Sequence, residues 1–206
     1  MSIKNNLDPR VIRTRLMLRD ALIALIGEQG YEKITVRDIA GRASLNRATF
    51  YLHYRDKQDL MEQSMDDTLK ELVDGLQPLF EDASEFRFDG GKPHPTFVWL
   101  FEEIARHARF YQVVLGEQRM PYFTRGLTDV ITGFVPKGLG TVAPEERQLA
   151  VPREMLVSYV VSAFLGVILW WLQSGMPYTA PYMAEKLMRL ATRGPYVDDP
   201  FTGAKE

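Results

Sequence analysis

The feature that most constrains the fold of this chain is the stretch of residues 35–57, TVRDIAGRASLNRATFYLHYRDK. Thr35 is a good N-cap and Asp38, three residues later, completes a capping box, so a short helix is predicted to start directly after Thr35. Asn46 is predicted to cap a second helix over residues 47–53. Small residues where the two helices meet would let them cross at close range. This is the pattern of a helix-turn-helix unit.

In a helix-turn-helix unit, the N-terminal residues of the second helix approach base edges in the major groove, and surrounding polar and basic groups hold phosphates. Asn46, Arg47 and Thr49 occupy the positions for base contacts, and the polar aromatic residues beside a Lys suit a clamp on the DNA backbone. Of the apolar residues Phe50 and Leu52, at least one should face the core. The predicted DNA-binding set is Thr35, Arg37, Asn46, Arg47, Thr49, Tyr51, His53, Tyr54 and Lys57.

These residues resemble the DNA-binding domain of the TetR family of transcriptional regulators. The family pattern has a capped short helix, an Ile-Ala pair and a small-residue turn, matched here by Thr35, Ile39-Ala40 and Ala43-Ser44. It ends in Thr-aromatic-Tyr-x-His/Tyr-aromatic-x-x-Lys, matched by residues 49–57, TFYLHYRDK. The resemblance covers roughly residues 10–62. Ser44 departs from it, because the family usually has Gly there and Ser needs a left-handed or near-bridge backbone at a modest cost.

The charge of the chain is unevenly distributed. Residues 1–60 hold 11 Lys and Arg against 7 Asp and Glu, whereas the remaining residues hold 14 against 20. Clustered positive charge attracts phosphate, and an acidic remainder must face away from DNA. The chain has no Cys, which excludes disulfides and thiolate sites and is compatible with a reducing cytoplasm. Its first residues have no apolar segment like that of a signal peptide, so a cytoplasmic location is expected.

The resemblance implies an all-α fold, with an N-terminal three-helix helix-turn-helix domain and a larger helical domain for ligand binding and dimerisation. The predicted boundary gives residues 1–57 to the DNA-binding domain and residues 58–206 to the effector-binding and dimerisation domain. An Asp8-Pro9 start signal predicts a first helix that ends at Gly30. Asp56 is predicted to cap a long helix that connects the two domains and ends before Pro78.

Apolar periodicity predicts five further helices, over residues 96–107, 110–115, 121–134, 152–172 and 181–191, with a loop opening at residue 135. In the TetR family the last two long helices form a four-helix dimer interface, so the resemblance implies a homodimer built from residues 152–172 and 181–191. A two-fold dimer supplies two reading helices. These would have to lie about one DNA turn apart, ~34–36 Å, to bind a palindromic operator.

One of these segments touches the length of a membrane span, because residues 155–172 contain no charged side chain. The segment nevertheless includes Ser158, Tyr159 and Ser162, and the other predicted helices are amphipathic. Apolar residues all around a helix are also typical of one that protein covers on every side. This second interpretation is favoured, no membrane partner is expected, and one cover can be another subunit.

No constellation for catalysis emerges from the sequence. Glu102-Glu103 and Glu145-Glu146 are adjacent rather than facing pairs, and no Ser sits in a nucleophile elbow. Glu103 and His107 are spaced one helical turn apart and could share a metal, but a structural salt bridge or solvated pair is favoured. We therefore predict no enzyme activity, no catalytic residue, no metal site and no cofactor.

The downstream domain is rich enough in aromatic residues to line an apolar cavity between helices, which is the usual construction of a ligand site. Most of these residues must be plain core, and polar tips make Tyr111, Tyr122 and Gln112 better candidates. The predicted contacts for a small apolar or aromatic effector are Trp99, Tyr111, Gln112, Met120, Tyr122, Phe123, Phe164 and Trp170.

Together these patterns and the resemblance predict a homodimeric transcriptional regulator, a repressor, that binds double-stranded DNA at a palindromic operator. A small molecule that prefers the arrangement with misplaced reading helices would release it from DNA. The alternative is a protein-interaction module with a vestigial DNA-binding head, and a helical enzyme is a third class without sequence support.

Overall fold

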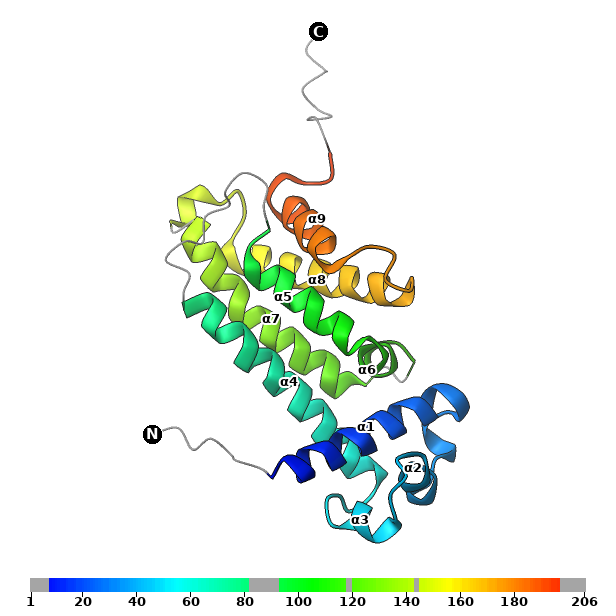
Figure 1. Cartoon of the computed structure of the whole chain (residues 1–206). Helices are drawn as coiled ribbons and strands as arrows, with labels where there is room; N and C mark the ends of the chain where they lie inside the picture. The colour runs from blue at the N-terminus through cyan, green and yellow to red at the C-terminus, as the bar shows by residue number, and fades with distance from the viewer. Residues whose placement is uncertain (1–7, 82–92, 118–119, 143–144, 197–206) are drawn as a thin grey trace.

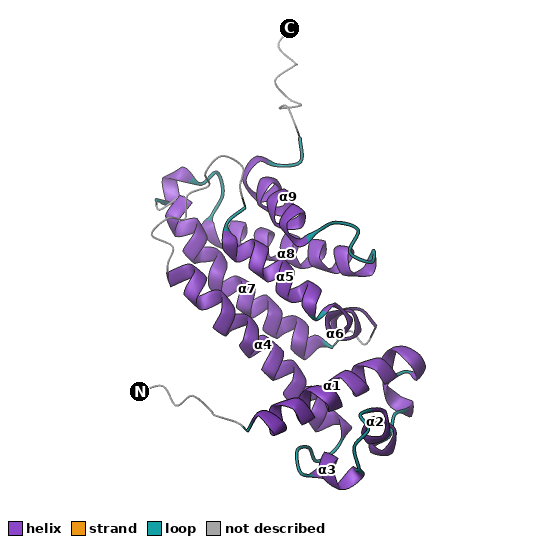
Figure 2. Cartoon of the chain, in the orientation of Figure 1, coloured by secondary structure: helices purple, strands orange, loops and turns teal. Residues whose placement is uncertain are grey.

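The computed structural model describes residues 8–81, 93–117, 120–142 and 145–196, and all regular structure in these ranges is helical (Figure 2). The predicted all-α fold is therefore confirmed. The first three helices lie together at one end of the molecule, the fourth runs from there to the other end, and the remaining helices pack beside one another at that other end (Figure 1).

The N-terminal end holds α1 (Pro9–Gln29), α2 (Val36–Arg42) and α3 (Arg47–Tyr51), with a single turn of 3-10 helix, η1 (Tyr31–Lys33), between α1 and α2. The predicted capping box at the start of α2 is present, since the Thr35 hydroxyl accepts from the Asp38 amide and the Asp38 carboxylate accepts from the Thr35 amide. The Asn46 side chain accepts from the Thr49 amide at 2.7 Å and caps α3. Helix α3 ends two residues earlier than predicted.

The turn between α2 and α3 has the predicted strain. Ser44 adopts a left-handed backbone with φ of 56°, the conformation in which Gly has no steric cost. The turn is held closed because the Leu45 amide donates to the Ala40 carbonyl at 2.8 Å. The helix-turn-helix turn therefore closes with Ser at this position.

Helix α4 (Lys57–Glu81) connects the two ends of the molecule (Figure 1). The predicted cap is present, because the Asp56 carboxylate accepts from the Asp59 amide at 2.8 Å. The prediction that α4 ends before Pro78 is wrong, since Pro78 lies inside it. A Pro removes one backbone donor and crowds the preceding turn, but here only the last turn of the helix follows it. At 1.5 Å per residue, α4 is about 37 Å long.

The other end is built from α5 (Pro95–Arg106), α6 (Ala108–Tyr111), a π-helical turn η3 (Gln112–Glu117), α7 (Pro121–Val142), a 3-10 turn η4 (Glu146–Gln148), α8 (Arg153–Gln173) and α9 (Ala180–Arg193). Helix α5 packs against α4 and α9, and α7 packs against α4 and α8. The predicted loop at residue 135 is wrong. Helix α7 continues through Pro136, because Phe134 and Val135 still pack against the core and hold the chain in its helical path.

Among the described residues, α8 is long and apolar enough to cross a membrane by length and composition, with a mean hydropathy of 2.1. A third of its most apolar window, 33%, is buried inside this chain. The same helix contributes Phe164, Ile168, Trp171 and Leu172 to the core.

The close approach of α4 and α5 can be tested by adding one methyl group. A Cβ at Gly75 would lie 2.1 Å from the Trp99 ring, so G75A forces the indole or the helices apart. We expect the free energy of unfolding to fall by about 1–3 kcal/mol, measured by urea denaturation. G133A is the matched control, because nothing lies within 4 Å of its added Cβ, and its helix propensity should raise stability by up to about 1 kcal/mol. Equal effects of both variants would contradict this packing.

Candidate nucleic-acid interface

Helix α3 presents a polar surface at the end of the molecule. Asn46, Arg47 and Tyr51 are exposed, and Thr49 is half-buried. The side-chain oxygen of Asn46 accepts hydrogen bonds from both the backbone amide and the hydroxyl of Thr49, at 2.7 and 3.0 Å. Since this oxygen is committed to the cap, the Asn46 amide group is the donor that can reach a base edge. This NH2 group can donate to a base acceptor such as a purine N7, whereas the two-bond pairing of Asn with adenine would also need the side-chain oxygen.

The Arg47 guanidinium lies 6.0 Å from the centre of the Tyr51 ring, within the range of a cation–π contact. This contact holds the guanidinium on the outer face of α3, where it is available to a guanine or a phosphate. Leu52, which is 81% exposed, follows on the same surface, and Phe50 is the apolar residue that faces the core, at 0% exposure. Leu52 was absent from the predicted set, because an apolar side chain carries no signal for DNA contact in a sequence.

Two further predicted residues flank α3 at the start of α2. Thr35 and Arg37 are exposed. The Thr35 hydroxyl donates to the Asp38 carboxylate at 2.6 Å, so it serves the capping box first. The Arg37 side chain is exposed beside it, and in a helix-turn-helix unit such side chains hold phosphates.

Lys57 and His53 are half-buried at the other side of α3. The Lys57 ammonium donates to the backbone carbonyls of Tyr31 and Glu32, at 2.9 and 3.1 Å. It also lies 4.6 Å from the centre of the Tyr31 ring. Lys57 therefore ties the start of α4 to the turn between α1 and α2, and the phosphate contact remains a prediction for it, as for His53.

Tyr54 differs from the prediction that it clamps the DNA backbone. It is only 3% exposed, and its hydroxyl accepts a hydrogen bond from the Arg15 Nε at 3.0 Å. Burial raises the pKa of this phenol above its usual value. The side chain faces inward because its ring packs against Phe50, 5.8 Å between ring centres, so in this arrangement it offers no group to DNA.

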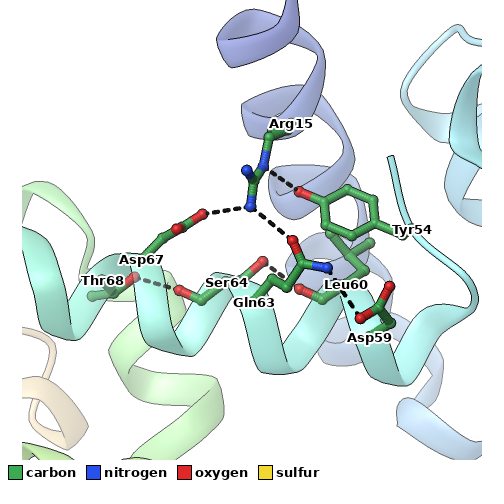
Figure 3. Close-up of polar contacts among 8 residues, drawn as sticks. All are labelled: Arg15, Tyr54, Asp59, Leu60, Gln63, Ser64, Asp67 and Thr68. Atoms are coloured by element: carbon green, nitrogen blue, oxygen red, sulfur yellow. Dashed lines mark hydrogen bonds and ion pairs between the residues drawn. The ribbon is translucent and has the colours of Figure 1, made fainter. Parts of the chain in front are cut away.

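Arg15 is the residue at the centre of this inward network (Figure 3). Its guanidinium donates to Tyr54, to the Gln63 side-chain oxygen at 3.0 Å and to the Asp67 carboxylate at 2.9 Å. It thus connects α1, the segment after α3, and α4. A sequence signal for this role does exist, because Arg15 lies three and seven residues before the buried Leu18 and Leu22 and so shares their inward face.

The network continues along α4 to Asp59, which accepts from the Gln63 amide at 3.0 Å and is buried. Its carboxylate also accepts from the backbone amide of Arg55 at 2.8 Å and from the Arg55 guanidinium at 3.1 Å. The Arg55 amide is the main cause, and together these donors lower the pKa of Asp59 to about 2. The charged carboxylate therefore fixes the chain segment that leads from α3 into α4.

The eight predicted effector residues are not brought together. Tyr111 and Phe123 are buried and contact each other, 5.7 Å between ring centres, and Phe164 packs against Phe97 at 5.4 Å. Trp99 fills the space over Gly75. These side chains are part of the helical core, as expected for most aromatic residues of a domain.

The remaining predicted effector residues lie elsewhere. Gln112 donates to the Leu172 carbonyl at 2.9 Å and fastens η3 to α8, while Met120 is half-buried and packs against the core. Tyr122 is 58% exposed, and its hydroxyl donates a hydrogen bond to the Asp66 carboxylate at 2.5 Å. Trp170 is 48% exposed. The expectation that Tyr122 and Trp170 line an internal cavity does not fit, because their positions on α7 and α8 face outward.

An open groove of about 530 Å³ lies between α7 and α8. None of the predicted effector residues lines it, since its walls are Thr128, Thr132, Pro136, Arg153, Glu154, Val157, Ser158, Val161 and Ser162. Its surface is mainly apolar, with Thr and Ser hydroxyls and the neighbouring Arg153 and Glu154 as its polar groups. The prediction missed it because it was based on aromatic residues, whereas aliphatic and small polar residues line this groove.

Two family models match the chain. Residues 18–63 match bacterial regulatory proteins of the tetR family, and residues 91–193 match the C-terminal region of transcriptional regulators of the same family. The second match alone spans half of the chain. The chain belongs to the TetR family. The first match includes α2 and α3, the two helices of the helix-turn-helix unit.

Individual relatives are distant from this TetR-family regulator. An uncharacterised helix-turn-helix regulator of Bacillus subtilis, YxbF, is 22% identical over 90% of this chain and 46% of its own length, so this chain spans about half of that relative. A probable acrEF/envCD operon repressor of Escherichia coli is 20% identical over 87% of both chains. The fold is similar to that of the fatty acid degradation regulator FadR from Bacillus halodurans, with a TM-score of 0.68, 16% identity and coverage of 88% and 95%.

The inward role of Tyr54 can be separated from a DNA contact with Y54F. This variant removes the hydroxyl that accepts from Arg15, and hydrogen bonds to charged groups contribute about 1.5–3 kcal/mol, so the free energy of unfolding should fall by that amount. Y51F removes the same atom from an exposed ring and should leave stability within about 0.5 kcal/mol of the wild type. Equal stability of both variants, with DNA affinity lost only in Y54F, would return Tyr54 to the DNA contacts.

The low pKa of Asp59 predicts an acid-sensitive contribution to stability. A carboxyl whose folded pKa is depressed stabilises the fold above its unfolded pKa, about 3.9, and loses that contribution as pH falls toward the folded value. The stability difference between wild type and D59N should therefore shrink as pH falls from about 4 to 2. Urea denaturation at a series of pH values measures it. A difference that stays constant across this range would show that the carboxylate is not held by these donors.

Proposed function

We propose that this regulator is a homodimeric, cytoplasmic repressor that binds a palindromic operator and leaves it when a small apolar or aromatic molecule enters the C-terminal helical part. The observation that carries the proposal is the capped helix α3, whose exposed Asn46 and Arg47 are positioned by a rigid inner network. We place the functional division at Lys57, so that residues 1–57 read DNA and residues 58–206 bind the effector and the partner.

The structure supports a division of labour among the DNA-reading residues. Asn46 and Arg47 have exposed polar groups at the start of α3, where base edges are reached, and the exposed Tyr51 lies at the end of this helix. Thr35 and Arg37, with His53 and Lys57 on the opposite side, suit phosphate contacts that set register. Thr49 acts through the Asn46 cap, because its hydroxyl donates to it. Tyr54 is assigned to the inner network.

Dimerisation is supported by exposed aromatic and apolar side chains on α8, on the loop after it and on α9. Tyr178 and Tyr182 stack with 4.7 Å between ring centres, and Trp170 lies 6.3 Å from Tyr178 at one edge of the stack. A large apolar surface of this kind on a soluble protein marks an interaction site. A second copy would cover it and would also cover the exposed part of α8. The residues concerned are Met155, Tyr159, Trp170, Tyr178, Tyr182 and Leu190.

Release from DNA requires a structural element whose position depends on both the DNA-binding site and the effector site. Helix α4 is that element, since it starts at the DNA-reading end and packs against α5 and α7 at the other. A ligand that prefers one position of α5 or α7 would shift the population of α4 positions, and with it the separation of the two α3 helices in a dimer. Repression is supported by the Escherichia coli relative, which is named a probable operon repressor.

The decisive experiment is selection of bound duplexes from a random DNA pool by the purified protein, repeated at two salt concentrations. An enriched inverted repeat with half-sites about one turn apart is expected. Recovery of no preferred sequence, or binding that disappears with salt, would leave only nonspecific charge attraction and favour a protein-interaction module. The selected duplex then serves as a probe for effectors that release the protein.

Replacing Arg47 should change operator choice rather than general affinity. A good contact between Arg and a base contributes about 1–3 kcal/mol of discrimination, so R47A should bind the selected operator roughly ten- to hundredfold more weakly and accept changes at one base position. K57A should weaken all duplexes by a similar factor, because it loosens the start of α4. R193A, an exposed Arg at the end of α9, is the control without effect. Fluorescence anisotropy with matched and mismatched duplexes measures all three.

A further inference from the structure

We propose that Glu71, Glu103 and His107 form a binding site for a divalent transition-metal cation between α4 and α5. The ligand atoms of the three side chains all lie within 4.8 Å of one another. Cation binding at this site goes beyond the proposed release from DNA and does not depend on it, because the cluster can be tested without operator or effector.

The packing of α4 against α5 fixes the position of this cluster. The two helices run antiparallel (Figure 1), and they approach most closely where the Trp99 ring covers Gly75. One helical turn from this contact along each helix lie Glu71 on α4 and Glu103 on α5, because residues four apart share a face. The close contact therefore sets the two carboxylates opposite each other.

His107 completes the cluster from the end of α5. It follows Glu103 by four residues, and its Nε2 lies 3.2 Å from a Glu103 carboxylate oxygen. The salt bridge favoured for this pair from sequence is thus present as a contact. The third side chain, Glu71, could not be foreseen because it comes from a helix more than thirty residues earlier in the chain.

The charges of the cluster favour a cation. Glu103 is buried, Glu71 is exposed, and their like charges repel at this separation. Arg106 pairs with Glu103, but its side chain is 63% exposed and can move away. Among the described residues, Glu71 has no ion-pair partner within 4 Å, and the neighbouring Lys70 pairs with Asp74. A divalent cation would offset both carboxylate charges at once.

The donor set indicates the class of cation. Two carboxylates and an imidazole suit Zn²⁺ and similar transition metals, whereas Mg²⁺ and Ca²⁺ prefer oxygen ligands alone. Zinc bonds to nitrogen and carboxylate oxygen are about 2.0–2.2 Å long, which places ligand atoms about 3–3.5 Å apart. The His107 and Glu103 ligand atoms are already 3.2 Å apart, and side-chain rotations that shorten the other separations, which are at most 4.8 Å, by up to about 1.3–1.8 Å are enough to reach this geometry.

Tyr111 provides a second, independent observation. Its hydroxyl is buried and has no hydrogen-bond partner among the described residues, which is costly for a polar group. Burial first, and then the charges of Glu103 and Glu71, raise the pKa of this phenol, while Arg19 acts in the opposite direction. The Tyr111 amide donates to the His107 carbonyl, and the His107 amide donates to the Glu103 carbonyl, each at 3.2 Å, so the three side chains follow one another at one-turn spacing on the same face. Metal-ligating carboxylates are themselves usually hydrogen-bonded, and Tyr111 can donate that bond once the side chains close on a cation.

The test is titration of the untagged, metal-free full chain with Zn²⁺ by calorimetry, and with Co²⁺ by visible absorption, which reports a protein-bound cobalt ion directly. One saturating Zn²⁺ per chain is expected, with Mg²⁺ at the same concentration unable to compete. Absence of saturating Zn²⁺ binding by the wild type would overturn the proposal.

Four variants identify the ligands. E71Q and H107A should each weaken Zn²⁺ binding by at least about tenfold, and E71Q changes an exposed residue, so its fold should persist. E102Q is the matched control, because Glu102 is the exposed neighbour of Glu103 on α5, and this variant should bind Zn²⁺ as the wild type does. R106Q should bind several-fold more tightly, because it removes the group that competes for Glu103. Binding that is unchanged in both E71Q and H107A would place the cation elsewhere and refute the site.

Discussion

The hydrogen bonds of Arg15 are the interaction on which the arrangement of the helix-turn-helix end depends. Helices α2 and α3 are too short to be stable alone, so their position is set by what they pack against. Arg15 on α1 fixes this position. It donates hydrogen bonds to Tyr54, just after α3, and to Gln63 and Asp67 on α4. A planar guanidinium with several donors can hold three partners in one geometry, which an ammonium cannot do as well. The hydrogen bonds of Arg15 on the inner side of this unit therefore hold the exposed surface of α3 in position.

The same helix α4 meets a second constraint at its other end. Gly75 leaves room for the Trp99 ring, and Gly126 does the same for Leu69, so α4 approaches both α5 and α7 closely. Arg109 at the start of α6 donates to the Ala24 carbonyl of α1 at 3.3 Å and links the two ends of the molecule by another route. Small shifts of α5 or α7 would therefore reach α1 and α4 together. Packed interfaces of this kind move between discrete arrangements rather than deforming gradually.

The sequence correctly predicted the caps and the turn that depend on residues close together in the chain. The capping box of Thr35 and Asp38, the Asn46 cap and the left-handed Ser44 follow from residues within four positions of one another, and each is present. The ends of α4 and α7 were predicted wrongly, because tertiary packing overrides the helix-breaking tendency of a Pro near a helix end.

Contacts between distant residues were beyond local patterns. Tyr54 has the composition of a phosphate clamp, and only Arg15, far away in the sequence, shows that it faces inward. The aromatic residues of the C-terminal part share one composition but divide between core, helix contacts and the surface of α8 and α9. Their periodicity indicates that one side of each helix is apolar, but it does not indicate which neighbouring element covers that side.

The partly covered α8 brings these constraints together. A helix with apolar residues all around needs cover on every side, and this chain buries only 33% of its most apolar window. If a second copy covers the rest, the two α3 helices are joined through a continuous path from α8 to α7, then to α4 and to Arg15. Their separation is then a property of helix packing throughout the chain, so any ligand that changes this packing changes the fit to DNA without touching the reading residues.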